Sequence, residues 1–450
     1  MSGTRVLTPV TGASCRRAAR RGGVAGLIGT ACAVLLAPAA QAQIQVSRSV
    51  LDTGIEFDLP SSERTTVLQR PHPELQPLGV RAGAFLIFPD VMTSAAATSN
   101  VFGSTNDAVS DAYAIVAPRV QANSQWSRHS LRGHASGTFR RYLSYPIKNE
   151  NGYDVGVESR LDIVGSSNVR AAVNADRIYV TQFSGDFPQL SASSLPIDRQ
   201  VASLRGTYEF NRLTLLGDVN VTRLNFSDTI ALNGNTLDQD YLDRRATRLT
   251  GRAEYNVSPV TSFFVQGVYT QHSYSDRSTT LDRSGDELRV IAGAAFDVTP
   301  LIRTRLGAGY LTRSYDQQGL PSVSGLAFDA QVDYLFSELT TISLAARRDV
   351  RDAVVTGSTS YTSSRASAEI DHELLRHLIL IARADLEKDD FARIDRDDTL
   401  FHVGAGATYT FNRYLVMTPM VDYSNRGSSG AQQGQRFNEI RASVSVAFRL

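Results

Sequence analysis

The eleven residues from Leu326 to Phe336 read LAFDAQVDYLF, and this stretch decides the fold class of the chain. Large apolar side chains recur at every second position, whereas Asp329, Gln331 and Asp333 fall between them. Successive side chains of a β-strand point to opposite faces, so the stretch predicts a strand with one apolar and one polar face. Two carboxylates and an amide argue against the core of a soluble sandwich. The apolar face therefore needs a second sheet or lipid as its partner.

The same alternation recurs along most of the chain from Gly79 onward. Three further examples are Leu288–Phe296, Ile342–Arg347 and Phe401–Phe411. Past residue 43 no apolar run approaches the roughly 18 residues of a transmembrane helix. A chain without such helices can still cross a membrane if its strands close into a barrel and pair every backbone group.

An aromatic-rich strand end followed by a tight turn repeats along the sequence. The copies are Tyr208–Leu213, Tyr255–Val260, Phe296–Leu301, Tyr334–Leu339, a degenerate Glu373–Leu378, and Tyr409–Tyr414. Their first residues lie 36 to 47 residues apart. Weaker turns of similar spacing occur near Ser127-Arg128 and Ser166–Asn168. This period fits one strand up, one polar loop and one strand down.

Polar loops are expected at the opposite ends of these hairpins. They are Gly103–Asp111, Ser227–Asp240, Arg277–Asp286, Asp389–Asp398 and Asn425–Gln435. Short turns on one side and long loops on the other are typical of outer-membrane barrels, so we predict an all-β, transmembrane, antiparallel up-and-down β-barrel of about 18 strands, with 16 as the alternative. A propeller has a similar repeat length but needs about four short strands per repeat.

The N-terminus predicts export. Residues 5 to 21 contain five arginines and no acidic residue, an apolar run follows from Val24, and Ala40-Gln41-Ala42 is a small-x-small cleavage pattern. We expect a signal peptide over 1–42, cleavage between Ala42 and Gln43, a periplasmic tail over 43–77 that is mainly disordered with a transient contact, and a barrel over 78–450. A retained anchor and twin-arginine export are the alternatives.

Removal of this leader would change the charge and the cysteine count. Without its five arginines, 41 basic residues face 45 acidic residues, which gives a net charge of −4. Both cysteines, Cys15 and Cys32, lie within the leader. The remaining chain would have no disulfide and no cysteine-based nucleophile or metal ligand.

The polar faces of the predicted strands give a set of candidate pore-lining residues. They are Arg248, Arg252, Glu254, Arg289, Arg303, Arg305, Asp329, Asp333, Arg347, Asp349, Arg383, Asp385 and Glu387. A barrel of this size is wide enough for an aqueous channel. The two signs are mixed, so the charges could bind a polar solute weakly along the lumen or could pair with one another.

Other chemistry has little support in the sequence. His272-Ser273-Tyr274-Ser275 places a serine beside a histidine in an expected loop, but no third group that would orient the pair is evident. The acidic residues of Asp389–Asp398 match no calcium-loop spacing and are expected to be solvated. No basic stripe with stacking aromatics indicates nucleic-acid binding. We expect no enzyme activity, no cofactor and no metal.

The segment Pro77–Pro89, with Ser99–Phe102 after it, resembles the opening strand and first loop of a known family. This family is the putative outer-membrane β-barrel family, also called putative β-barrel porin 2, and the resemblance extends loosely over Leu78–Leu450. It implies a cell outer-membrane location and an exit pore for exopolysaccharide or capsular polysaccharide that works with a periplasmic export protein. A porin for small solutes and a structural or adhesive barrel are the alternatives.

The expected partners follow from the same barrel. Membrane lipid and lipopolysaccharide would contact its apolar face. The alternating segment Ile440–Leu450 resembles the tag that the barrel assembly machinery recognises, although its aromatic, Phe448, is third from last.

Overall fold

A computed structural model describes residues 65–70, 72–182, 187, 191–275, 282–353, 355 and 357–450 of the chain. The expected signal peptide, its cleavage site at Ala42-Gln43 and the first part of the expected tail lie outside these residues. Strands make up most of the described chain, together with the three short 3₁₀ turns η2 (Val67–Gln69), η3 (Pro146–Lys148) and η4 (Asp240–Leu242). None of the helices in the described part is long and apolar enough to cross a membrane.

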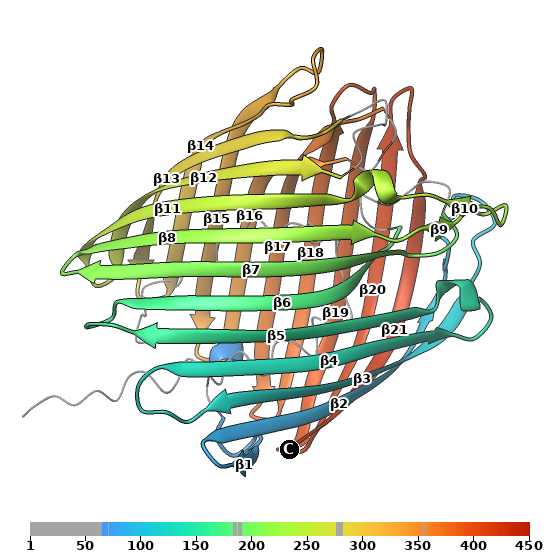
Figure 1. The fold of residues 1–450 in the computed structure, drawn as a ribbon. Coiled ribbons are helices and arrows are strands. Elements are labelled where there is room, and N and C mark those ends of the chain that lie inside the picture. The colour runs from blue at the N-terminus through green and yellow to red at the C-terminus, as the bar shows by residue number, and fades with distance from the viewer. Residues whose placement is uncertain are drawn as a thin grey trace, which may run out of the picture.

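Eighteen long strands in the described residues form one antiparallel barrel (Figure 1). They are β2 (Phe85–Thr98), β3 (Asp111–Ser124), β4 (Ser130–Tyr142), β5 (Glu150–Asp162), β6 (Asn168–Val180), β7 (Leu195–Phe210), β8 (Leu213–Phe226), β11 (Arg244–Ser258), β12 (Thr261–Tyr274), β13 (Gly285–Thr299), β14 (Ile302–Arg313), β15 (Val323–Ser337), β16 (Thr340–Asp352), β17 (Ser360–Leu375), β18 (Leu378–Phe391), β19 (Asp397–Asn412), β20 (Leu415–Ser429) and β21 (Phe437–Arg449). The predicted strand count is confirmed.

Each long strand pairs with the next long strand along the chain, and the first long strand pairs with the last. The closing ladder joins β2 to β21, from Asp90 opposite Arg449 to Thr98 opposite Arg441. A closed ladder leaves no sheet edge, which is what a hydrocarbon environment requires of a β-structure. Three short strands lie outside the ring: β1 (Val80–Ala82) pairs with β2, and β9 (Thr229–Ile230) pairs with β10 (Thr236–Leu237).

The two ends of the barrel differ as predicted. At the turn end, consecutive hairpins are joined by connections as short as Asn211-Arg212 and Arg413-Tyr414. At the loop end, the connections are as long as residues 227–243. All eight turns expected from the aromatic repeat and its weaker copies are confirmed. Aromatic side chains just before the turns, such as Tyr208, Phe336 and Phe411, are exposed on the outer surface, where an interfacial aromatic girdle would lie.

The outer face of the barrel is apolar and the inner face is polar. Along β15, Leu326 is 74% exposed, whereas Asp333 on the alternate register is 5% exposed. The final strand follows the same rule, since Ile440, Val444 and Phe448 are exposed and Ser443 and Ser445 are buried. An exposed apolar band that encircles a sheet is stable only against lipid.

Two expectations about loops are wrong. Asp389 and Asp398 lie within β18 and β19, facing each other across the ladder, and both are buried. Only residues 392–396 connect these strands, so Asp389 and Asp398 do not belong to a solvated loop, whereas Asp390 and Asp395 are exposed. His272 lies in β12 rather than in a loop, and it is buried. Ser273 is adjacent on the same strand and points to the opposite face, so the two side chains do not form a catalytic pair.

Candidate functional site

All thirteen candidate pore-lining residues lie on the inner register of the barrel. Inner positions are even-numbered on β11 and β12 and odd-numbered from β13 to β18, because the neighbouring positions carry the exposed apolar side chains. The candidates come from β11, β13, β14, β15, β16 and β18. Closure of the sheet therefore places residues that are up to 139 positions apart, from Arg248 to Glu387, on one inner wall.

Ion pairs join many of these residues into a chain across β14 to β18. Arg305 Nη2 lies 3.4 Å from a carboxylate oxygen of Asp329, and Arg347 lies 3.8 Å from Asp329 and 3.7 Å from Asp349. Arg351, which the sequence did not single out, continues the chain to Asp349 at 3.3 Å and to Glu387 at 2.7 Å. Guanidinium–carboxylate contacts of this kind hold the inner side chains in fixed positions.

Neighbouring strands extend the charged surface. On β11, Arg252 donates to Glu254 at 2.6 Å and stacks over the Phe264 ring, with 4.4 Å between guanidinium carbon and ring centroid. Beyond β18, His402 lies between Asp385 at 3.4 Å and Asp422 at 3.2 Å. The inner wall is therefore polar around much of its circumference.

A second group of charges, at the loop end, was not anticipated from the sequence. Asp352 forms ion pairs with Arg313 at 2.6 Å and with Arg244 at 3.3 Å. Glu287 lies 3.7 Å from Arg313, and the Nε2 atom of His272 is 3.1 Å from the same guanidinium. All five side chains are buried. Since Arg244 belongs to β11 and Asp352 to β16, these contacts cross the interior and narrow the loop end of the barrel.

Loop residues fill another part of the same end. Gln182, in the connection after β6, donates to the carbonyl oxygen of Val101 at 3.1 Å. The backbone carbonyl oxygen of Gln182 accepts a hydrogen bond from Arg426 of β20 at 3.0 Å. Arg426 and Arg396 both bind Asp398 at 2.6 Å. This explains why Asp398 is buried: two arginines neutralise its carboxylate.

Lys148 of η3 is buried among these loop residues. Its ammonium nitrogen lies 5.3 Å from the Phe102 ring centroid and 3.5 Å from Gln182 Oε1. Burial lowers the pKa of Lys148 to about 8, against the opposing effect of Glu150 and Glu439.

This pKa predicts a pH-dependent stability. In the unfolded chain the lysine has a pKa of about 10.4. Between pH 8 and 10.4 the unfolded chain therefore binds more protons than the folded chain. The free energy of unfolding should increase by up to about 3 kcal/mol as the pH rises through this window. Lys148→Met should remove this gain. The measurement is the difference in unfolding midpoint between wild type and variant from pH 7 to pH 10.5. A difference that stays constant over this range would contradict the assignment.

The turn end is crossed by residues 65–70 and 72–78, which we call the mouth segment. Val67 is 1% exposed, and its backbone N–H donates to Thr341 Oγ1 of β16 at 3.0 Å. Arg70 binds the buried Glu373 of β17 at 2.7 Å and donates to the carbonyl oxygen of Glu338. The carbonyl oxygen of Leu75 accepts from Arg449 of β21 at 2.9 Å.

The expectation of a disordered tail is therefore wrong for these residues. The mouth segment extends from β16 and β17 to β21 along the inner rim, and Figure 1 shows η2 in blue at this end of the barrel. The mouth segment contacts inward-facing side chains of strands that are more than 250 residues away in the sequence. A local sequence pattern does not predict such long-range contacts.

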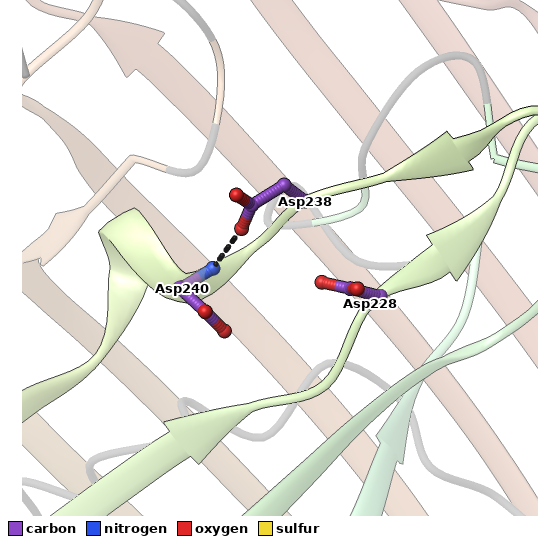
Figure 2. A group of neighbouring side chains, drawn as sticks. All are labelled: Asp228, Asp238 and Asp240. Atoms are coloured by element: carbon purple, nitrogen blue, oxygen red, sulfur yellow. Dashed lines mark hydrogen bonds between the residues drawn. The ribbon is translucent and has the colours of Figure 1, made fainter.

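Three aspartates gather in the loop between β8 and β11. Figure 2 shows Asp228, Asp238 and Asp240, whose carboxylate oxygens lie within 4.8 Å of one another. All three are exposed. Two of the carboxylates accept backbone N–H groups, Asp238 from Asp240 at 2.8 Å and Asp228 from Gln239 at 3.3 Å. Turn chemistry of this kind accounts for the grouping without a bound ion.

Comparison with known proteins identifies a family whose model matches this chain. A family model described as putative beta-barrel porin 2 matches residues 72–450. No curated protein matches the chain.

Several solved structures resemble the barrel. OccK1 (OpdK) of Pseudomonas aeruginosa is 12% identical, covers 81% of this chain and 99% of its own, and has a TM-score of 0.46. OccAB4 of Acinetobacter baumannii is 11% identical over 85% of this chain and 100% of its own, with a TM-score of 0.47. A BenF-like porin of Pseudomonas fluorescens Pf-5 is 11% identical over 81% and 98%, with a TM-score of 0.46.

Proposed function

The chain belongs to the putative β-barrel porin 2 family of outer-membrane barrels, and from that premise we propose that it is a channel for small polar solutes. The observation that carries the proposal is the inner wall of the barrel, which is lined with arginine and carboxylate side chains along its length. Such a wall is expensive in a closed, purely structural barrel, because buried charges rarely gain as much from pairing as they lose in hydration. It is the ordinary lining of an aqueous path.

Small solutes are favoured over a polymer by the loop end. Arg244 and Arg313 both contact Asp352 across the interior, and Gln182 binds Arg426 from a distant strand. A polysaccharide chain would have to displace these contacts continuously during export. A small solute needs only a narrow, hydrated route past them. Export of exopolysaccharide remains the alternative, and it follows only from the resemblance of the opening segment Pro77–Pro89 to the family.

The proposal is tested by reconstitution and by gene deletion together. Liposomes that contain the full-length mature protein should swell in isosmotic solutions of small sugars and amino acids, at rates that fall as solute size increases. Deletion of the gene should leave the amount of secreted polysaccharide unchanged. Liposomes that exclude all small solutes, together with loss of secreted polysaccharide, would establish the export alternative. Exclusion of solutes with no change in polysaccharide would indicate a structural or adhesive barrel.

A further inference from the structure

The two signs of charge are mixed along the sequence but are separated around the barrel. On the inner register of β11 to β14, seven arginines face the interior against three acidic residues. On the inner register of β15 to β18, nine acidic residues face the interior against four arginines. One side of the interior is therefore basic and the adjoining side is acidic.

The boundary between the two sides lies at one strand pair. Arg305 of β14 and Asp329 of β15 form an ion pair across it. Figure 1 shows β11, β12 and β13 crossing the front of the barrel and β15 to β18 behind them. Eleven arginines and twelve acidic residues nearly balance over these strands, so the net charge of this wall selects weakly between anions and cations. Their separation instead produces a field directed across the channel.

Side chains on both sides retain capacity to bind a solute. Arg289 of β13 is 5% exposed, and its Nε–H has no hydrogen-bond acceptor in the described chain. On the acidic side, Asp371 of β17 is 2% exposed, and its Oδ1 atom accepts no hydrogen bond there. Glu369 lies two residues before Asp371 on the same inner face of β17. Across the sheet, Asp333 of β15 pairs with Ser343 of β16, and Ser343 pairs with Glu369, so Asp333 and Glu369 lie at the same level of the inner wall.

We propose that the channel selects dipolar solutes that carry one anionic and one cationic group, with the arginines of β11 to β14 facing the anionic end and the carboxylates of β15 to β18 facing the cationic end. This inference rests on the proposed solute channel. A solute with both charges lowers its energy by lying across the field, whereas an ion of one sign is attracted to one side and repelled by the other. A neutral solute gains nothing from the field.

The test compares solutes of similar size in liposome-swelling assays with the full-length mature protein. The probes are β-alanine, which is zwitterionic, the propionate anion, the ethylammonium cation, and arabinose as a neutral reference. β-Alanine should permeate about tenfold faster than either single ion, an effect of the size that charged clefts give to encounter rates. The advantage should shrink in high salt, which screens the field.

Variants separate the inference from the proposed function. Glu369→Gln and Arg289→Gln should each lower β-alanine flux severalfold and leave arabinose flux unchanged. Lys388→Gln, on the outer register of β18 and largely exposed, is the matched control and should change neither flux. Equal rates for β-alanine and the single ions, with arabinose still permeant, would overturn the inference and leave the channel intact. Loss of all fluxes in the wild type would overturn the proposed function as well.

Discussion

Replacing Asp352 with alanine should destabilise the barrel by about 3–5 kcal/mol, the range measured when one partner of a buried ion pair is removed. Asp352 lies 2.6 Å from Arg313, which is 1% exposed, and 3.3 Å from Arg244, which is also buried. Without the carboxylate, two guanidinium groups stay buried beside each other. Glu287 lies 3.7 Å from Arg313 and replaces only part of the favourable charge interaction that Asp352 provides.

Urea unfolding in detergent micelles, followed by the heat- and urea-dependent shift in electrophoretic mobility, measures this effect. The matched control is Asp397→Ala, which breaks an exposed pair with Lys388 at 4.0 Å. Pairs of that kind contribute at most about 1 kcal/mol, so the control should unfold close to wild type. A variant in which Asp352, Arg313 and Arg244 are all replaced by apolar residues should recover much of the stability. Equal midpoints for Asp352→Ala and Asp397→Ala would show that the cluster contributes little.

The strands could be predicted from the sequence because the signals that define them are local. Alternation, as in Leu326–Phe336, depends only on side chains two positions apart, and the aromatic-turn repeat depends on about six consecutive residues. The inner register of Arg289 or Asp329 follows directly from the same alternation. These features specify which face of a strand a side chain occupies, and the structure has them as expected.

The partners of the charged residues could not be predicted in this way. Asp352 meets Arg313 and Arg244, which are 39 and 108 positions earlier, and these contacts depend on register and on the curvature of the closed sheet. The burial of Asp398 could not be predicted because one of its two neutralising arginines, Arg426, lies on another strand. The same limit applies to the mouth segment, where Val67 contacts Thr341. Long-range pairing of polar groups has no periodic signature.

Releasing the mouth segment should increase the conductance of the channel. The segment lies across the turn end through the burial of Val67, the bond from its backbone N–H to Thr341, and the ion pair between Arg70 and Glu373. Val67→Asp would place a carboxylate in a site that is 1% exposed, beside Thr341, whose register partner on β17 is the buried Asp371. Burial of an unpaired charge costs several kcal/mol, more than the roughly 1.5–3 kcal/mol that burial of one apolar side chain contributes, so the segment should detach.

Single-channel recordings in planar bilayers compare wild type, Val67→Asp and a chain that lacks residues 65–77 after the leader. Both variants should show larger unitary conductance than wild type, and the two should agree, because detachment and deletion clear the same rim. Arg81→Ala, on the exposed β1 next to the segment, is the matched control and should conduct like wild type. The barrel itself should remain folded, since the eighteen-strand ladder of the described chain closes through β2 and β21 without the segment. Identical conductance in all four proteins would mean that the ionic path avoids the part of the turn end where Val67 and Arg70 bind.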